Sequence, residues 1–194
     1  MFLNKSTLKA VRLATATDGP RWMLTGVRFE PGRMIGCDGH RMHVVEWGDA
    51  DGGLEACTVD GEAVRALEKR ATSKPMILSV DESNRNGALT VVDPEGQPHR
   101  ADKLEGEYPN TDKVWPTGDP VASVTLDARY LKDAAEAAIA VWSAHGRTKA
   151  LETTAPTLTL EIRGDATGPV VLRLEGESDE RPERFKALVM PRRK

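Results

Sequence analysis

The chain has 194 residues, of which 39% are hydrophobic and 29% are charged, with a net charge of −3 at neutral pH. This balance excludes a disordered chain and a general nucleic-acid coat protein, which would be basic throughout. No apolar run reaches the ~20 residues that span a bilayer, a signal-peptide pattern is missing, and there are only two cysteines, so we expect a soluble, cytoplasmic protein of one or two domains without membrane contact.

Three helical patterns alternate with β-prone segments along the chain. Each helix is predicted to follow an N-cap residue, Asn4, Asp60 or Asp127, whose side-chain oxygen accepts free amide protons of the first turn. Strands are predicted, in chain order, at 22–29, 41–47, 76–80, 88–92, 157–162, 170–174 and 186–190. A short extended segment, a helix and then several strands favour an α+β fold with antiparallel sheets over a doubly wound parallel sheet.

The three helix starts also resemble one another in sequence. They align as FLNKSTLKAV, TVDGEAVRAL and TLDARYLKDA, beginning at Phe2, Thr58 and Thr125. Four residues after each cap is an aliphatic residue (Leu8, Val64 and Leu131), and the next residue is a base (Lys9, Arg65 and Lys132). Seven residues after each cap is an apolar residue (Val11, Leu67 and Ala134). Offsets four and seven share a helical face, so the pattern predicts a repeated unit whose helix packs on a sheet. Three unrelated amphipathic helices are the alternative.

A more specific motif follows the first helix. Residues 24–47 read LTGVRFEPGRMIGCDGHRMHVVEW, which is an apolar strand, a Pro-Gly turn, a second strand and Asp38-Gly39-His40-Arg41. This resembles the middle domain of the bacterial DNA polymerase III beta sliding clamp, whose Thr-Asp-Gly-His-Arg segment has its threonine replaced here by Cys37. Three more segments are similar to the family in the same order: LEGEYP at 104–109, the helix that follows Asp127, and ALVMPRR at 187–193.

The resemblance implies a DNA-clamp fold of repeated strand–helix–strands units, with antiparallel sheets outside and helices on one face. Residues 1–117 would form a complete clamp-like domain of two units, about 1–56 and 57–117. Residues 118–194 would form half a domain, with the third unit. In the family, twelve such units close a ring, so four chains of three units each would form one ring. The third unit of one chain would pair with the third unit of another, and such a contact requires a two-fold axis.

The resemblance also implies a function: a sliding clamp, or polymerase processivity factor, that is not an enzyme and has no cofactor or metal. It would encircle duplex DNA without reading its sequence, since strong phosphate contacts would impede sliding. The helix bases expected to face DNA are Lys5, Lys9, Arg12, Arg65, Lys69, Arg129 and Lys132. Their alternative is a solvated helix face with ion pairs, which Asp133 and Glu136 favour on the third helix.

In the family, polymerases and other replication proteins dock short linear peptides, often a Gln followed by hydrophobic residues, between the middle and last domains. Carried over by position, the pocket would consist of Arg21, Leu24, Cys37, Gly39, His40, Arg41, Met42, Pro116, Leu188, Val189, Met190, Pro191 and Arg192. Ordinary core packing is the alternative for Met42, Leu188 and Val189. The basic end of the chain, 192–194, departs from the family and makes an acidic peptide more suitable.

Other chemistry finds little support. Cys37, His40 and His43 have metal-ligand spacing, but residues three apart on a strand point to opposite faces, so no metal site is predicted. No phosphate loop, dinucleotide motif or nucleophile elbow is present, which argues against an enzyme. A second hypothesis is a non-ring, clamp-like module that sequesters or regulates replication proteins. Which partner docks, whether a clamp loader is needed and whether a ring closes stay open.

Overall fold

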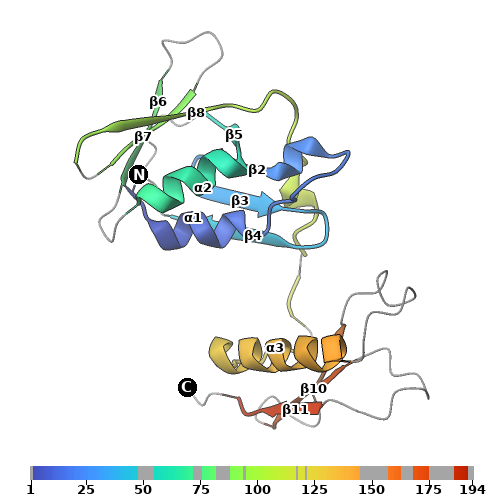
Figure 1. The fold of residues 1–194 in the computed structure, drawn as a ribbon. Coiled ribbons are helices and arrows are strands. Elements are labelled where there is room, and N and C mark those ends of the chain that lie inside the picture. Colours follow the sequence, from blue (N-terminus) through green and yellow to red (C-terminus); the bar gives the residue numbers. More distant parts are fainter. Residues whose placement is uncertain are drawn as a thin grey trace. The chain divides into compact units, whose positions relative to one another are not determined.

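The computed structural model describes residues 2–47, 55–71, 76–81, 88–93, 95–116, 118–120, 122–144, 157–162, 168–174 and 186–191. The chain divides into two compact units, Met1–Trp115 and Pro116–Lys194 (Figure 1).

The first unit contains two antiparallel sheets and a pair of helices. Its described elements are β1 (Phe2–Leu3), α1 (Lys5–Arg12), η1 (Trp22–Thr25), β2 (Gly26–Glu30), β3 (Arg33–Cys37), β4 (Met42–Glu46), β5 (Cys57–Asp60), α2 (Gly61–Arg70), β6 (Met76–Asp81), β7 (Ala88–Val92), β8 (Pro98–Asp102) and η2 (Thr111–Lys113). The sheet orders are β4-β3-β2-β5 and β1-β6-β7-β8. Each four-stranded sheet therefore takes one strand from the other half of the unit.

Both helices of this unit begin at the predicted caps. Asn4 Oδ1 accepts the Thr7 N–H at 2.9 Å, while Thr7 Oγ1 accepts the Asn4 N–H at 3.2 Å, which completes a capping box. Asp60 Oδ1 accepts the Glu62 N–H at 2.8 Å at the start of α2. The predicted caps Asn4 and Asp60 are confirmed.

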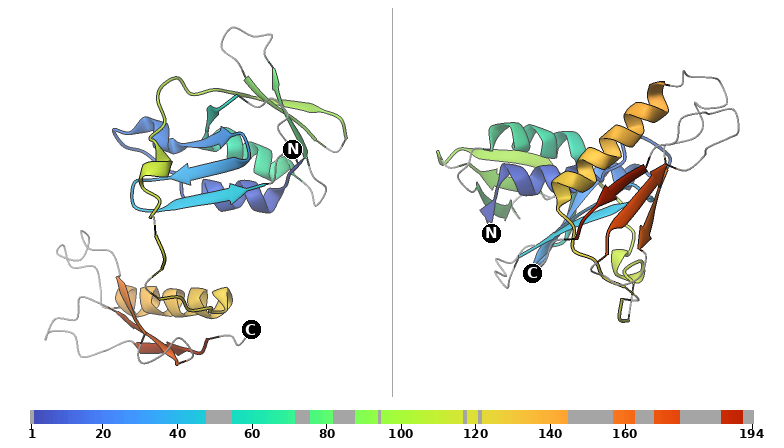
Figure 2. Two further views of the ribbon diagram at one scale, coloured as in Figure 1. Left: turned by 180° about the vertical axis from the view of Figure 1, so that it is seen from behind. Right: turned by 90° about the horizontal axis from the view of Figure 1, so that it is seen from below.

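The helix pair buries the apolar stripes that the repeat predicted. α1 and α2 lie side by side and run in opposite directions on one face of the β4-β3-β2-β5 sheet (Figure 1). Seen from behind, the strands of this sheet lie in front of the two helices (Figure 2, left). Leu8, Val11 and Val64 are fully buried, and Leu67 is 3% exposed. Gly36 permits the close approach of helix and sheet, because a Cβ there would lie 1.9 Å from the Val11 carbonyl oxygen.

Two elements differ from the expected ones. Residues 22–25, expected to begin a strand, form the 3-10 turn η1, and the strand starts only at Gly26. The polar segment PHRAD forms the unexpected edge strand β8, which pairs with β7. On this strand, the His99 imidazole Nε2 lies 2.8 Å from Asp93 Oδ2, and this contact links β8 to the residue that follows β7.

The second unit consists of one described helix on a three-stranded antiparallel sheet. Its elements are α3 (Ala128–Ala144), β9 (Leu158–Ile162), β10 (Val170–Leu174) and β11 (Lys186–Val189), in the sheet order β11-β10-β9. Asp127 Oδ1 accepts the Arg129 N–H at 2.9 Å, as expected of a cap. Ala134 and Ala138 are buried, but Leu131 is 36% exposed, contrary to the prediction for the aliphatic position of the repeat. None of the described helices has the length and hydrophobicity needed to cross a membrane.

Candidate functional site

The Asp38–Arg41 turn is held in shape by its own aspartate. Asp38 Oδ1 accepts the backbone N–H groups of His40 and Arg41 at 2.8 and 2.9 Å, and Oδ2 pairs with Arg41 Nε at 3.0 Å. Hydrogen bonding from the His40 N–H, the largest cause, holds the pKa of Asp38 below its ordinary value. Gly39 has φ +89°, a left-handed conformation that favours glycine, and the side chains of His40 and Arg41 that follow it are exposed.

Several predicted pocket residues of the first unit do lie together. A Cβ on Gly39 would meet Arg21 Nη1 at 3.6 Å and Leu24 Cδ1 at 4.0 Å, which places η1 directly beside the turn. Cys37 and Met42 pack against the apolar cluster that contains Leu24. An apolar floor therefore adjoins the turn.

Three side chains with N–H donors lie on the turn or directly beside it. Arg21, His40 and Arg41 are all exposed. Guanidinium and imidazole groups in these positions can donate hydrogen bonds to the carbonyl or carboxylate oxygens of a bound chain. The arrangement is suited to hold an extended peptide that has an apolar side chain and acidic neighbours.

The other predicted pocket residues belong to the second unit, and their approach to the turn stays a prediction. Pro116 is exposed, and Leu188 and Met190 on and after β11 are 60% and 59% exposed. Val189 is only 4% exposed and packs in the core of its own unit with Ala134. Pro191 is half-buried, and Arg192 lies outside the described residues.

The predicted DNA-facing bases fall into two groups. Lys5, Lys9 and Lys69 are exposed and, within the part of the chain that the structure describes, have no ion-pair partner. The other four bases are paired: Arg12 with Glu68 at 2.8 Å, Arg65 with Glu62 at 3.4 Å, Arg129 with Asp127 at 2.7 Å, and Lys132 with Glu136 at 3.3 Å. On α3 the ion-paired alternative therefore describes the observed surface.

Arg12 has a structural partner that its position on α1 did not reveal. Its Nε donates to Glu68 Oε2 across the helix pair, and the two side chains are 23% and 11% exposed. This ion pair joins α1 to α2, so Arg12 has a partner within the unit.

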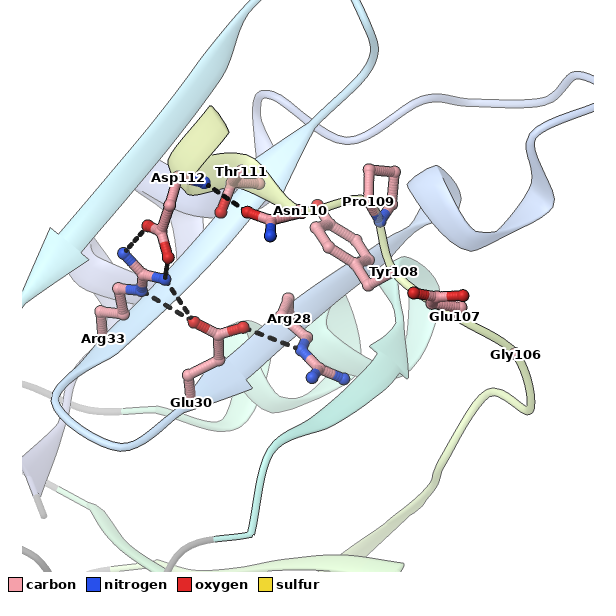
Figure 3. Close-up of a pocket in the computed structure, with 10 residues that line it drawn as sticks. All are labelled: Arg28, Glu30, Arg33, Gly106, Glu107, Tyr108, Pro109, Asn110, Thr111 and Asp112. Atoms are coloured by element: carbon pink, nitrogen blue, oxygen red, sulfur yellow. Dashed lines mark hydrogen bonds and ion pairs between the residues drawn. The ribbon is translucent and has the colours of Figure 1, made fainter. Parts of the chain in front are cut away.

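Sequence reasoning missed a polar hollow of about 570 Å³ on the first unit, lined by Arg28, Glu30, Arg33 and residues 106–112 (Figure 3). Glu30 accepts from Arg28 Nε at 3.2 Å and from Arg33 at 2.8 Å, while Arg33 also pairs with Asp112 at 2.8 Å. The Arg33 hydrogen bond lowers the pKa of Asp112. These contacts join the segment after β8 to the β2–β3 hairpin. The LEGEYP segment and the 24–47 motif both contribute lining residues, but neither sequence pattern indicated that they meet.

Metal chemistry has no site in the described part of the chain, where no three His, Cys, Asp or Glu side chains converge. His43, one of the residues with metal-ligand spacing, instead contacts the Ala10 carbonyl oxygen through Nδ1 at 2.7 Å and joins β4 to α1.

Comparison with known proteins identifies the fold. No protein-family model and no curated protein sequence matches the chain. Among solved structures, the DNA polymerase III beta chain of Streptococcus pneumoniae matches with a TM-score of 0.69 and 20% identity, over 100% of this chain and 49% of that chain. The sliding clamp of Bacillus subtilis matches with a TM-score of 0.70 and 14% identity, over 96% and 46%.

A DnaN sliding clamp from Bartonella birtlesii, solved with griselimycin bound, also matches, with a TM-score of 0.70 and 16% identity over 98% of this chain and 50% of that one. The chain thus spans about half the length of the clamps it matches. The predicted α+β clamp architecture is confirmed: the chain has the fold of the bacterial DNA polymerase III beta sliding clamps.

Proposed function

We propose that this protein is a DNA sliding clamp, a processivity factor that surrounds duplex DNA as a ring of several copies and docks replication proteins through a peptide pocket. The observation that carries the proposal is the match of the whole chain to solved sliding clamps. No catalytic group is required, because a clamp holds its partner on DNA by topology.

The α1–α2 surface is the proposed DNA-facing surface. Lys5, Lys9 and Lys69 offer exposed ammonium groups without an ion-pair partner among the described residues. Lysine contacts phosphates as a flexible point charge, so each contact is weak, salt-sensitive and independent of base sequence. A few such contacts keep DNA centred without stopping its movement.

The Asp38–Arg41 turn, with its apolar floor, is the proposed docking site. Gly39 has no side chain above Arg21 and Leu24, so a peptide backbone can approach closely. Leu24 and Met42 would receive an apolar side chain of the peptide, and the Met42 side chain adapts to different shapes. We propose that β11 and Pro116 supply the second wall, and that a polymerase peptide with hydrophobic and acidic residues is the partner.

The proposed ring contains four chains, since each chain contributes three repeats and twelve close a clamp ring. Assembly onto DNA would either follow from association of chains around the duplex or require a clamp loader.

Retention on circular DNA tests the proposal. The protein is mixed with nicked circular duplex at a concentration where the chains are dissociated, concentrated to allow assembly, and separated by gel filtration before and after the circle is cut. A clamp remains with the circle and is lost on linearisation. Equal retention on linear DNA, or no retention on the circle, contradicts encirclement.

Charge variants sharpen this experiment. Exchanging the three lysines, Lys5→Glu, Lys9→Glu and Lys69→Glu, is expected to reduce loading on the circle, because the surface then repels phosphate. The matched control is Lys113→Glu, an exposed lysine on η2, which is expected to load normally.

One observation favours the second candidate, a non-ring module that sequesters replication proteins. Four of the seven predicted DNA-facing bases are paired with acidic side chains of the same chain, which leaves less charge for DNA. Such a module would bind the polymerase peptide normally but show no retention on circular DNA.

A further inference from the structure

The two repeats of the first unit complete each other. β5, the strand before α2, pairs with β2 of the first repeat, and β1, the strand before α1, pairs with β6 of the second. The helices pack side by side, and Arg12 and Glu68 form an ion pair between them. One repeat of this type therefore gains its fourth strand and its neighbouring helix from another repeat.

The third repeat lacks this neighbour among the described residues of its unit. At the position four residues after the cap, Leu8 on α1 and Val64 on α2 are fully buried, whereas the equivalent Leu131 on α3 is 36% exposed. The segment 122–126, which precedes α3 as β5 precedes α2, forms no strand with another described segment. The same position is thus covered in two repeats and uncovered in the third.

The sheet beneath α3 has an uncovered apolar face next to the helix. On β9, Leu160 and Ile162 are 49% and 43% exposed. They pair with Leu172 and Val170, respectively, so they lie on the same side of the sheet as these residues, which pack with α3. On the corresponding side of its own sheet, the first unit carries a second helix. We therefore expect a helix with its own apolar stripe to pack on this exposed face.

The residue eight positions after the cap indicates which helix would cover this apolar face. In the first unit this position is Arg12 on α1 and Glu68 on α2, and these opposite charges meet at 2.8 Å. In the third repeat it is the half-buried Ala135. Two identical helices related by a two-fold axis place the same residue opposite itself, where a charge would repel its copy and an alanine does not.

We propose that this surface, formed by Leu131, Ala135, Leu160 and Ile162, binds the same surface of a second copy of this chain. The two α3 helices pack in opposite directions around a two-fold axis near Ala135, as α1 and α2 do in the first unit. The contact needs neither DNA nor a peptide, so it stands apart from the proposed function. In a ring it would be one of the joints between chains.

A charge exchange tests the contact on the full chain. In Ala135→Glu and Ala135→Lys, identical charges would face each other across the axis. Analytical ultracentrifugation without DNA is expected to show that the wild-type chains pair and that each variant alone pairs at least about tenfold more weakly. An equimolar mixture of the two variants regains pairing, because Glu then faces Lys. Controls are Ala140→Glu and Ala140→Lys, at an exposed position on another face of α3, which are expected to pair as the wild type does.

Wild-type chains that stay single at high concentration overturn the proposal. Variants at Ala135 that pair normally overturn it too, as does a mixture that stays dissociated while circular dichroism shows that both variants are folded. Pairing without retention on circular DNA would support this contact and contradict the clamp function alone, so the two failures are distinguishable.

Discussion

Asp38 is expected to determine the stability of the turn that forms the proposed docking site, and Asp38→Ala removes three interactions at once. Two are hydrogen bonds from the His40 and Arg41 N–H groups, at 2.8 and 2.9 Å, and one is the 3.0 Å ion pair with Arg41. The Arg41 side chain is 60% exposed, so its ion pair contributes at most about 0.5 kcal/mol. The Asp38 side chain is only 18% exposed, and each N–H bond to its carboxylate contributes about 1 kcal/mol.

The expected loss in the free energy of unfolding is therefore about 2 kcal/mol for Asp38→Ala. Asp38→Asn keeps an acceptor oxygen for the two N–H groups but loses the charge and the oxygen that faces Arg41 Nε, so its expected cost is below about 1 kcal/mol. Urea unfolding at neutral pH measures both values. A matched loss is expected in peptide affinity, measured by fluorescence polarisation, because the turn no longer presents His40 and Arg41 in a fixed geometry.

The same carboxylate makes the effect depend on pH. Because the pKa of Asp38 is lowered in the folded state, its contribution is fully present above the ordinary carboxyl pKa and is lost as the pH falls through the folded value. The stability difference between the wild type and Asp38→Asn should accordingly shrink on acidification. A constant difference, or an Asp38→Ala variant as stable as the wild type at neutral pH, would refute this role of the turn.

Three other experiments have defined outcomes. Gly36→Ala should destabilise the first unit by about 3 kcal/mol in urea unfolding, because its Cβ would lie 1.9 Å from the Val11 carbonyl oxygen; a loss below about 1 kcal/mol means that α1 can move away from the sheet. A double-mutant cycle of Arg12→Ala and Glu68→Ala should give a coupling energy of about 1 kcal/mol, and additive effects would show that the ion pair does not stabilise the helix pair. Gly39→Ala should cost about 1 kcal/mol for its positive φ and also weaken peptide binding, whereas unchanged affinity in polarisation assays would place the peptide elsewhere.

Local signals in the sequence predicted the features that depend on local physics. The caps at Asn4 and Asp60 act through residues two or three positions away, and the apolar stripe of each helix follows from its 3.6-residue period. Both features could therefore be predicted from the sequence. The exposure of Leu131 was not, because it depends on a neighbouring helix rather than on the sequence of α3. The edge strand at 98–102 was missed because its sequence is polar and the small Ala101 is its one buried hydrophobic residue.

The candidate site shows the same division. The turn at Asp38-Gly39 was predicted because its two residues are adjacent in the chain, whereas the place of His40 and Arg41 in the site was implied by the family resemblance. The partner of Arg12 could not be read from α1, because Glu68 is 56 residues away. Arg33 and Asp112, which are 79 residues apart, likewise meet only when the segment after β8 returns to the β2–β3 hairpin.

The mass of the assembled protein in solution, measured by light scattering over a range of concentrations, tests the ring most directly. The proposed ring of twelve repeats, with three repeats proposed for each chain, requires four chains. We predict a mass of four chains that passes through two chains on dilution. A single chain at every concentration would contradict encirclement of DNA, however well the peptide pocket binds.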